Sequence, residues 1–342
     1  MQPSPSHTAA TLDAVAARAG VSRATASRVL TGSSKVSEGA RVAVTAAADA
    51  LSYVANPAAR SLAKRRSDSI AFVVVESEER LFTDPFFAAV LRGVQGVLAE
   101  RELQLLFVVV GNERDRERFV RFAGQGHIDG AILLSVHGHD PLPTRLRERG
   151  VRVVMSGRPY AHLPDVLFVD ADNRGGGRQA AELLLSRGCR RIATVHGPLD
   201  MPAAQDRLEG FTARLAEAGT PRSTVCVVDG DFSIPGGEVA MHEVLRRCPE
   251  VDGVFAANDL SALGALQALA DAGRAVPADV AVVGFDDVPV ALGARPALTT
   301  VRQPIEAMGR AMADLLVRAV EDDAEGPTSL VLPTEVVRRV SA

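Results

Sequence analysis

The chain of 342 residues is poor in cysteine and has no long apolar run. Its three cysteines, Cys189, Cys226 and Cys248, are scattered, odd in number and form no CxxC pair, so we expect buried or idle thiols in a reducing compartment. No stretch approaches the roughly 18 uncharged apolar residues of a membrane-spanning helix. The first eleven residues lack a basic start followed by an apolar run, so a secretory signal is not indicated. These absences predict a cytoplasmic protein with no membrane partner.

The motifs of common catalytic chemistries are missing as well. The sequence has no GxxxxGK[ST] phosphate loop and no GxSxG nucleophile elbow. The triple glycine at 175–177 could cradle a phosphate at the start of a helix, but close packing is the favoured interpretation. Residues 137–140 (HGHD) resemble a metal cluster only superficially, and we expect an ordinary polar loop.

Two pairs of acids could serve hydrolysis, Asp170 with Asp172 and Asp286 with Asp287. Adjacent carboxylates on one strand, such as those at 286 and 287, tend to point in opposite directions, which disfavours joint action. We therefore predict no catalytic residue, no metal, no cofactor and no enzymatic activity.

Charge is distributed unevenly along the chain. The net charge is −4, but residues 1–68 carry nine Arg or Lys and four Asp or Glu, which leaves +5 on this segment and −9 on the rest. A basic head on an acidic body indicates a nucleic-acid partner, although a solvated charged surface is the alternative. The length, with an ordinary 47% of hydrophobic residues, predicts two or three globular cores.

The basic head has the pattern of three short helices. Thr11 can cap a first helix whose apolar residues recur at 12, 15, 16 and 19, and Gly20 can end it. Ser22 can cap a second helix to about residue 30, and Ser37 a third with apolar residues at 42, 46 and 51. A helix, a glycine turn and a short helix form a helix-turn-helix, in which the second helix enters the major groove.

Side chains on the second helix suit DNA. Arg23 and Arg28 can each grip guanine in a bidentate manner, while the hydroxyls of Ser22 and Thr25 can reach phosphates. Ala24 can offer only an apolar contact, for example to a thymine methyl group. A three-helix packing unit without a DNA role is the alternative.

Two segments resemble the LacI/GalR family of bacterial transcription regulators. Residues 11–22 (TLDAVAARAGVS) with 25–30 (TASRVL) are similar to its DNA-binding signature, and residues 53–62 (YVANPAARSL) to its hinge. The resemblance implies base reading by positions 23, 24 and 28, and a hinge helix that enters the minor groove. The expected DNA-binding residues are Thr11, Ser22, Arg23, Ala24, Thr25, Ser27, Arg28, Asn56, Ala59 and Leu62.

The body has an α/β pattern. Runs of Val and Ile without alternation are separated by amphipathic helices, which is typical of parallel sheets covered on both faces. Predicted strands lie at 70–75, 105–110, 131–135, 151–155, 192–196, 225–228, 253–256 and 280–285, and predicted helices at 86–100, 114–124, 174–187, 203–218, 236–247, 260–272 and 305–320.

The predicted organisation has three parts. Residues 1–56 form the helix-turn-helix domain, 57–68 the hinge helix and linker, and 69–342 an effector-binding and dimerisation domain. By resemblance, this body is like a periplasmic binding protein with two lobes. We expect the first lobe at about 69–172 and 302–327, and the second at about 173–301 and 328–342.

The ligand site should lie beyond the carboxyl ends of the strands. Polar residues there are more often helix caps or turn formers, but the body carries further stretches similar to family motifs, such as residues 207–211 (RLEGF) and 283–287 (VGFDD). The resemblance implies effector contacts at positions 207, 258 and 286, stacking at 232, and structural roles for Asp259 and Asp287. Arg158 and Asp172 are weaker candidates. The expected effector-binding residues are Phe86, Arg207, Phe232, Asn258 and Asp286.

These features together predict a homodimeric repressor of carbohydrate-utilisation genes that a sugar releases from double-stranded operator DNA. A repressor that needs a purine-like corepressor is the main alternative, because an acid and an aromatic face suit a base equally well. A sugar-binding protein or an enzyme without DNA function would leave the basic head unexplained.

Overall fold

The computed structural model describes residues 10–30, 35–53, 66–161, 163, 166–221, 224–322 and 327–342. The chain divides into two compact units, a head within residues 1–68 and a body of residues 69–342. Each unit has a hydrophobic core of its own.

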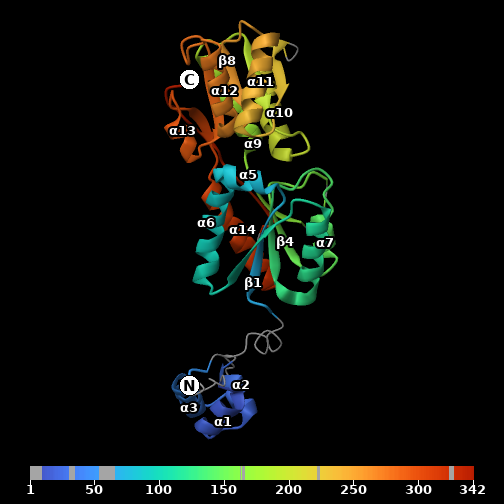
Figure 1. Ribbon diagram of the computed structural model, residues 1–342, viewed down its shortest axis with the longest axis vertical. Helices are drawn as coiled ribbons and strands as arrows, with labels where there is room; N and C mark the ends of the chain where they lie inside the picture. Colours follow the sequence, from blue (N-terminus) through green and yellow to red (C-terminus); the bar gives the residue numbers. More distant parts are fainter. Residues whose placement is uncertain are drawn as a thin grey trace, which may run out of the picture. The chain divides into compact units, whose positions relative to one another are not determined.

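The described residues of the head form three helices, α1 (Leu12–Ala19), α2 (Arg23–Leu30) and α3 (Glu38–Ala50) (Figure 1). The predicted ends of α1 are confirmed. The Thr11 hydroxyl accepts a hydrogen bond from the N–H of Ala14 at 3.3 Å, and Gly20 ends the helix at a φ of 66°, where glycine avoids the steric penalty of a Cβ.

Small side chains fill the core of the head. The buried members are Val15, Ala16, Ala26, Val29, Val44, Ala47 and Ala48. Val42 and Ala46, two apolar residues of the predicted third helix, lie on α3 but are exposed, with Val42 61% exposed. Since α3 is rich in Ala and Val, several stripes of its surface are equally apolar, and contacts with α1 and α2 select the stripe that is buried.

The first lobe of the body is built on a six-stranded sheet of order β11-β5-β4-β3-β1-β2, in which all neighbours are parallel. Side chains of its strands alternate between two cores, so that Phe72 faces one helical layer and Val73 the other. The strands are β1 (Ser69–Val74), β2 (Gln104–Val109), β3 (Gly130–Leu134), β4 (Arg152–Ser156), β5 (Leu167–Ala171) and β11 (Ser329–Leu332).

Helices cover both faces of this sheet. On one face lie α6 (Pro85–Glu100) and α14 (Ile305–Val320), and on the other α7 (Glu113–Phe122) and α8 (Leu142–Arg147). A π-helical turn, Ala123–His127, follows α7. The short helix α5 (Glu78–Thr83) follows the carboxyl end of β1.

The second lobe repeats this plan with the order β12-β10-β9-β8-β6-β7, and only the β10–β12 pair is antiparallel. One face carries α9 and α10, and the other carries α11 and α12. The elements are β6 (Ile192–His196), β7 (Cys226–Asp229), β8 (Gly253–Ala256), β9 (Ala281–Asp286), β10 (Thr299–Arg302), β12 (Glu335–Val337), α9 (Asn173–Ser186), α10 (Pro202–Glu217), α11 (Ile234–Arg247), α12 (Asp259–Asp271) and α13 (Pro289–Gly293).

The predicted fold class is confirmed, and each strand and helix predicted for the body is present with ends within two residues. The sequence pattern missed the shorter elements: α5, α8, α13, β5, β10, β11 and β12.

The chain crosses between the lobes three times, between β5 and α9, between β10 and α14, and between β11 and β12. The expected division, which placed 328–342 in the second lobe, is wrong for β11, because Ser329–Leu332 pairs with β5 of the first sheet. Arg302, expected at the start of the first-lobe segment, belongs to β10 of the second sheet. Both strands have only four residues, and their sequences do not say which strands they pair with.

Candidate functional site

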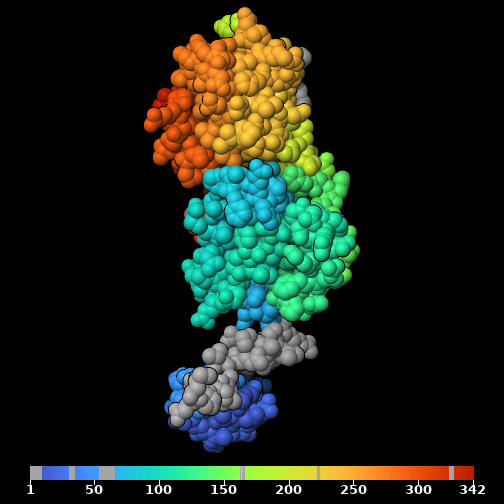
Figure 2. Space-filling model, in the orientation of Figure 1, coloured from blue at the N-terminus to red at the C-terminus, as the bar shows by residue number. Residues whose placement is uncertain are grey.

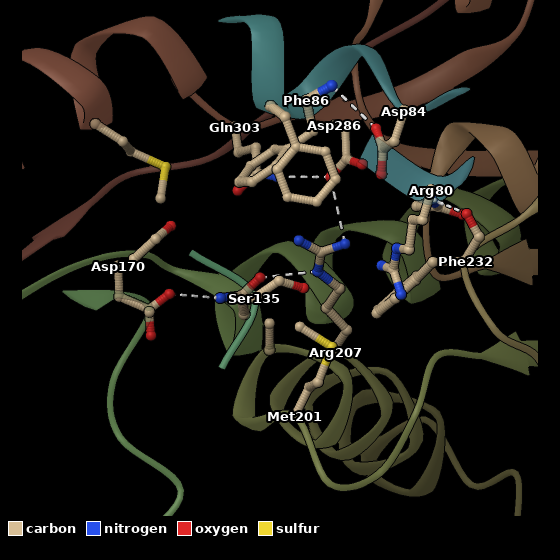
Figure 3. Close-up of a pocket in the computed structure, with 17 residues that line it drawn as sticks. Arg80, Asp84, Phe86, Ser135, Asp170, Met201, Arg207, Phe232, Asp286 and Gln303 are labelled. Carbon is tan, nitrogen blue, oxygen red and sulfur yellow. Dashed lines mark hydrogen bonds and ion pairs between the residues drawn. The ribbon is translucent and has the colours of Figure 1, made fainter. Parts of the chain in front are cut away.

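A cavity lies between the two lobes, at the carboxyl ends of their strands (Figure 3). Its empty volume, with its open mouth, is about 600 Å³, within the roughly 300–1,000 Å³ of small-molecule sites. All five residues predicted to contact an effector line it. The lining comprises Arg80, Asp84, Phe86, Phe87, Ser135, Ser156, Gly157, Asp170, Asn173, Met201, Ala203, Arg207, Phe232, Asn258, Asp286, Gln303 and Met308.

A buried ion pair between Arg207 and Asp286 lines this cavity. Arg207 on α10 lies with its Nη1 3.3 Å from Oδ1 of Asp286, and the two side chains are only 6% and 7% exposed. Arg207 also donates from Nε to Asn173 Oδ1 at 2.8 Å and from Nη1 to the carbonyl of Ala257 at 2.6 Å. Its guanidinium carbon lies 3.7 Å from the centroid of the Phe285 ring. These contacts hold the guanidinium group of Arg207 in one orientation at a position shielded from water, where it can donate hydrogen bonds.

Burial dominates the electrostatics of this pair. It raises the pKa of Asp286 to about 7, although Arg207 and the amide of Gln303, which donates at 2.6 Å, both act to lower that pKa. Burial lowers the pKa of Arg207, against the attraction of Asp286. A carboxyl group in this state can accept or donate a hydrogen bond near neutral pH.

Phe232 presents an aromatic ring to the cavity. The ring lies over Gly197, where an added Cβ would be 2.0 Å from the ring, so only glycine leaves room for it. Asn258 Nδ2 donates to the carbonyl of Phe232 at 2.9 Å, while Asn258 Oδ1 caps α12 by accepting from the N–H of Ser261. Asn258 therefore holds the main chain of Phe232 next to the start of α12, whatever its contact with a ligand.

Phe86 comes from the opposite lobe. Asp84 caps α6 by accepting the N–H of Phe86 at 2.9 Å, and burial raises the pKa of Asp84. The half-buried ring of Phe86 lies edge-on to that of Phe87, with centroids 5.6 Å apart. The cavity thus has an aromatic side chain from each lobe.

Three cavity residues have backbone conformations that L side chains rarely adopt. The φ angles are 56° at Ser135, 66° at Phe232 and 107° at Asp286. Such strain persists only where the surrounding structure imposes it, and it gathers at binding and catalytic sites. The clustering of three such residues around one cavity makes this cavity the candidate functional site of the body.

The head presents a polar helix. Ser22, just before α2, is exposed; on α2 itself, Arg23, Ala24 and Arg28 are exposed, and Thr25 and Ser27 are half-buried. Ser22 caps α2 as predicted, accepting the N–H of Thr25 at 3.1 Å. Thr11 caps α1 and is also exposed. The other predicted DNA-binding residues, Asn56, Ala59 and Leu62, lie outside the described residues.

The chain is similar to known proteins along its whole length. Residues 11–56 match the bacterial regulatory proteins of the lacI family, and residues 181–342 match the periplasmic binding protein-like domain. The HTH-type transcriptional regulator CelR of Thermobifida fusca is 47% identical over 333 residues, which are 97% of this chain and 98% of that protein. The chain belongs to the lacI family. The ribose operon repressor of Escherichia coli (strain K12) is 33% identical over 97% of this chain and 100% of its own length.

Solved structures of lacI-family proteins share this fold. The complex of the regulator CelR with cellobiose has a TM-score of 0.78 and 45% identity, and covers 97% of this chain and 100% of that chain. The lac repressor dimer bound to operator and the anti-inducer ONPF has a TM-score of 0.82 and 25% identity, and covers 98% and 99%. This lacI-family protein is a DNA-binding transcription regulator, and its relatives are regulators rather than enzymes.

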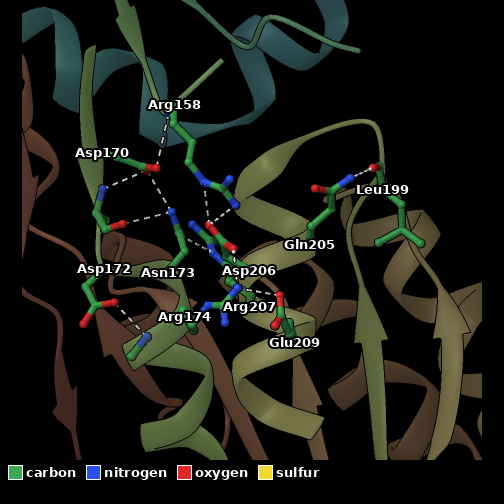
Figure 4. Close-up of polar contacts among 12 residues, drawn as sticks. Arg158, Asp170, Asp172, Asn173, Arg174, Leu199, Gln205, Asp206, Arg207 and Glu209 are labelled. Carbon is green, nitrogen blue, oxygen red and sulfur yellow. Dashed lines mark hydrogen bonds and ion pairs between the residues drawn. The ribbon is translucent and has the colours of Figure 1, made fainter. Parts of the chain in front are cut away.

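Several cavity residues of this lacI-family protein were missed by sequence reasoning. Asp170 and Asn173 flank the crossing after β5, where Asn173 Nδ2 donates to Asp170 Oδ1 at 2.9 Å and Asn173 Oδ1 accepts from Arg207 (Figure 4). The same strand-end rule that selected Asp286 would have found them if β5 had been expected. Gln303 lies at the next crossing, and Arg80 lies on the missed helix α5.

The two acid pairs that could serve hydrolysis, Asp170 with Asp172 and Asp286 with Asp287, have separate partners in the structure. Asp170 binds Asn173, whereas Asp172 caps α9 by accepting the N–H of Gly175 at 2.8 Å. Asp286 faces Arg207, while Asp287 lies between Arg302 and Arg339. Asp259 accepts hydrogen bonds from Val288 and Thr300. Arg158, a weaker candidate, binds Asp206 across the lobes, with Nε 2.9 Å from Oδ2.

The triple glycine in α9 serves close packing. An added Cβ on Gly177 would lie 2.2 Å from the carbonyl oxygen of Arg207 on α10, and one on Gly176 would lie 2.5 Å from the ring of Phe285. In the 137–140 loop, His137 lies between Glu76 and Asp200, with both N···O distances 3.0 Å. The described residues hold no group of three His, Cys, Asp or Glu placed to bind a metal ion. Within the same residues, no helix is long and apolar enough to span a bilayer.

Proposed function

We propose that this lacI-family protein is a cytoplasmic, homodimeric repressor of carbohydrate-utilisation genes, and that a sugar of the cellobiose type releases it from its operator. The observation that carries the proposal is the inter-lobe cavity, which combines a buried Arg207–Asp286 pair with aromatic rings from both lobes.

The chemistry of the cavity matches a neutral oligosaccharide. A sugar offers hydroxyl groups that donate and accept hydrogen bonds, and apolar ring faces that stack on aromatic side chains. Asp286, with a pKa near 7, and Asp170, whose pKa burial also raises, can interact with hydroxyl groups. Phe86 and Phe232 supply the stacking surfaces. The 47% identity with CelR, which forms a complex with cellobiose, supports a disaccharide.

The head supplies the sequence-specific part. On α2, Arg23, Ala24 and Arg28 are exposed and can reach base edges, while the hydroxyls near the start of the helix can reach phosphates. In a homodimer, two such helices would enter major grooves of a pseudo-palindrome with half-sites roughly 34–36 Å apart, or a multiple of this distance.

Release follows from a population shift. A ligand that binds one arrangement of the two lobes better than another changes the balance between them, and the hinge segment then docks on DNA or leaves it. Contacts that span the lobes, such as Arg158 with Asp206, are the ones that such a change would alter. Complete control requires a differential affinity of about 10⁴-fold.

The test is binding of the purified protein to its own upstream DNA at fixed salt, with cellobiose, other sugars or purines. We expect specific binding that cellobiose abolishes, and a Gly197→Leu variant, whose side chain would displace the Phe232 ring, that still binds DNA but no longer responds. Binding that appears only with a purine would reverse the sign of control. Loss of all specific binding under every condition would refute the repressor proposal.

A further inference from the structure

Arg80 lines the cavity from the first lobe and lies close to the Phe232 ring of the second lobe. It lies on α5, which follows β1, and Figure 2 shows this segment in light blue on the surface of the first lobe where it borders the second. Its Nη1 is 3.0 Å from Glu76 Oε1, and its guanidinium carbon lies 5.4 Å from the centroid of the Phe232 ring in the second lobe. Arg207 approaches the same ring at 5.8 Å, so two guanidinium groups flank this aromatic side chain.

One donor of Arg80 has no hydrogen-bond partner in the described part of the chain. Among the described residues, Nε of Arg80 is the only buried side-chain nitrogen that makes no hydrogen bond. Charged donors are seldom buried without an acceptor, because the lost contact with water is not replaced. Arg207, the other arginine of the lining, already donates to Asn173 and Ala257. Of the two arginines among the described lining residues, Arg80 is therefore the one with a buried N–H group, at Nε, that has no acceptor.

The surroundings define the acceptor that fits this donor. The carboxyl groups of Asp84, Asp170 and Asp286 line the same cavity, and burial raises the pKa of each of them. Each of these carboxyl groups repels an anionic ligand when it is ionised, whereas a neutral hydroxyl group can hydrogen-bond to either protonation state. The geometry points to a sugar hydroxyl next to the Phe232 ring.

We infer that Arg80 is a specificity-determining residue of the effector site, which donates from Nε to a hydroxyl group of the bound oligosaccharide while Nη1 remains on Glu76. This inference rests on the proposed sugar effector. Glu76 also accepts hydrogen bonds from Ser135 at 2.6 Å and His137 at 3.0 Å, and His137 reaches Asp200 of the second lobe. Ligand contact at Arg80 is thus joined to a chain of polar contacts that ends on the opposite lobe.

Two substitutions at Arg80 separate this role from packing. Arg80→Met keeps much of the apolar stem, and Arg80→Lys keeps the charge for Glu76, but neither has an N–H at the position of Nε. Arg118→Met is the matched control, because Arg118 lies on α7, is 76% exposed and does not line the cavity. Titration calorimetry of the full chain with cellobiose gives the affinity, and thermal unfolding and operator binding without sugar check the fold.

We expect both Arg80 variants to bind cellobiose about 10- to 100-fold more weakly, the effect of one charge-assisted hydrogen bond, with unchanged operator affinity. A set of monodeoxy cellobioses gives the decisive readout. The parent should lose affinity for the analogue that lacks the accepting hydroxyl, and the Arg80 variants should not distinguish that analogue from cellobiose.

The outcomes are distinct. Variants that bind cellobiose as tightly as the parent overturn the role of Arg80 and leave the proposed function intact. Variants that bind more weakly yet discriminate among the analogues as the parent does show an indirect role, and also overturn it. A parent that binds neither cellobiose nor any other sugar overturns the proposed effector, and the role of Arg80 with it.

Discussion

Replacing Arg207 by Met should expose how much the body depends on its buried ion pair. The methionine removes the contact of the guanidinium with the Phe285 ring and the hydrogen bonds to Asn173 and Ala257, and it leaves Asp286 without its cation. Asp286 is 7% exposed, so water cannot readily take the place of the guanidinium. Breaking a buried pair from one side costs about 3–5 kcal/mol of unfolding free energy.

The loss should depend on pH with a definite sign. The folded-state pKa of Asp286 already lies near 7, above its usual value of 3.8, and removal of Arg207 raises this pKa further because Arg207 is the larger of the two influences, with Gln303, that oppose the effect of burial. The folded state then binds more protons than the unfolded state, so stability falls as pH rises from about 4 through the folded pKa. The variant should therefore be less destabilised at pH 5.5, where Asp286 is protonated, than at pH 8.

The assay is urea unfolding of the full chain at one protein concentration, at pH 5.5 and pH 8, because assembly would make stability depend on concentration. Adding Asp286→Asn to Arg207→Met should recover part of the loss at pH 8. The exposed Arg118→Met variant should stay within about 0.5 kcal/mol of the parent. An Arg207→Met protein as stable as the parent at pH 8 would refute the reasoning.

Three further expectations test other parts of the molecule. Gly177→Ala should lower the free energy of unfolding in urea by about 1–3 kcal/mol, because the added Cβ would clash with the backbone of α10. Gly96→Ala is the control, because a Cβ at Gly96 would have no atom within 4 Å, and it should stabilise α6 by about 0.5–1 kcal/mol. Equal effects of the two substitutions would contradict the packing argument. Arg28→Ala should weaken operator binding by about 1–3 kcal/mol and relax base preference in a gel-shift series, and unchanged binding would remove Arg28 from the reading face. His137→Gln should lower the free energy of unfolding at pH 6 but not at high pH. The hydrogen bond to Glu76 raises the pKa of His137 above 6.5, so the stability that protonated His137 contributes is lost as pH rises through the folded-state pKa. A stability difference that does not change with pH would contradict this role of His137.

Much of the architecture could be predicted because its strongest patterns are local. Strands such as β1 are buried on both faces, so nearly every residue is apolar and the run stands out in the sequence. β11 could not be recognised in this way, since its burial alternates and one face is exposed, and its place beside β5 depends on a partner more than 150 residues away. Short strands of this kind are defined by pairing rather than by composition.

The candidate site was predictable where its residues follow long strands. Asp286 is the last residue of β9, and Asn258 lies two residues after the end of β8. Because ligands of such sheets bind beyond the carboxyl ends of the strands, both residues are expected at one site. Arg80 could not be predicted as a site residue because α5 has only six residues, which are too few to show a helical period in the sequence. A signal was nevertheless present. Ser77 caps α5, and Glu78 and Glu79 lie in its first turn, a start pattern that directly follows β1.

The three crossings between the lobes set the order in which the newly made chain can complete its folds. The head has its own core and is contiguous, so its described helices can pack once residue 53 has left the ribosome. The first lobe must wait, because α14 covers one face of its sheet and β11 forms its edge, and both are encoded after almost the whole second lobe. During synthesis, a DNA-reading head therefore exists for nearly 280 residues of elongation before the sensor that controls it can close its first sheet.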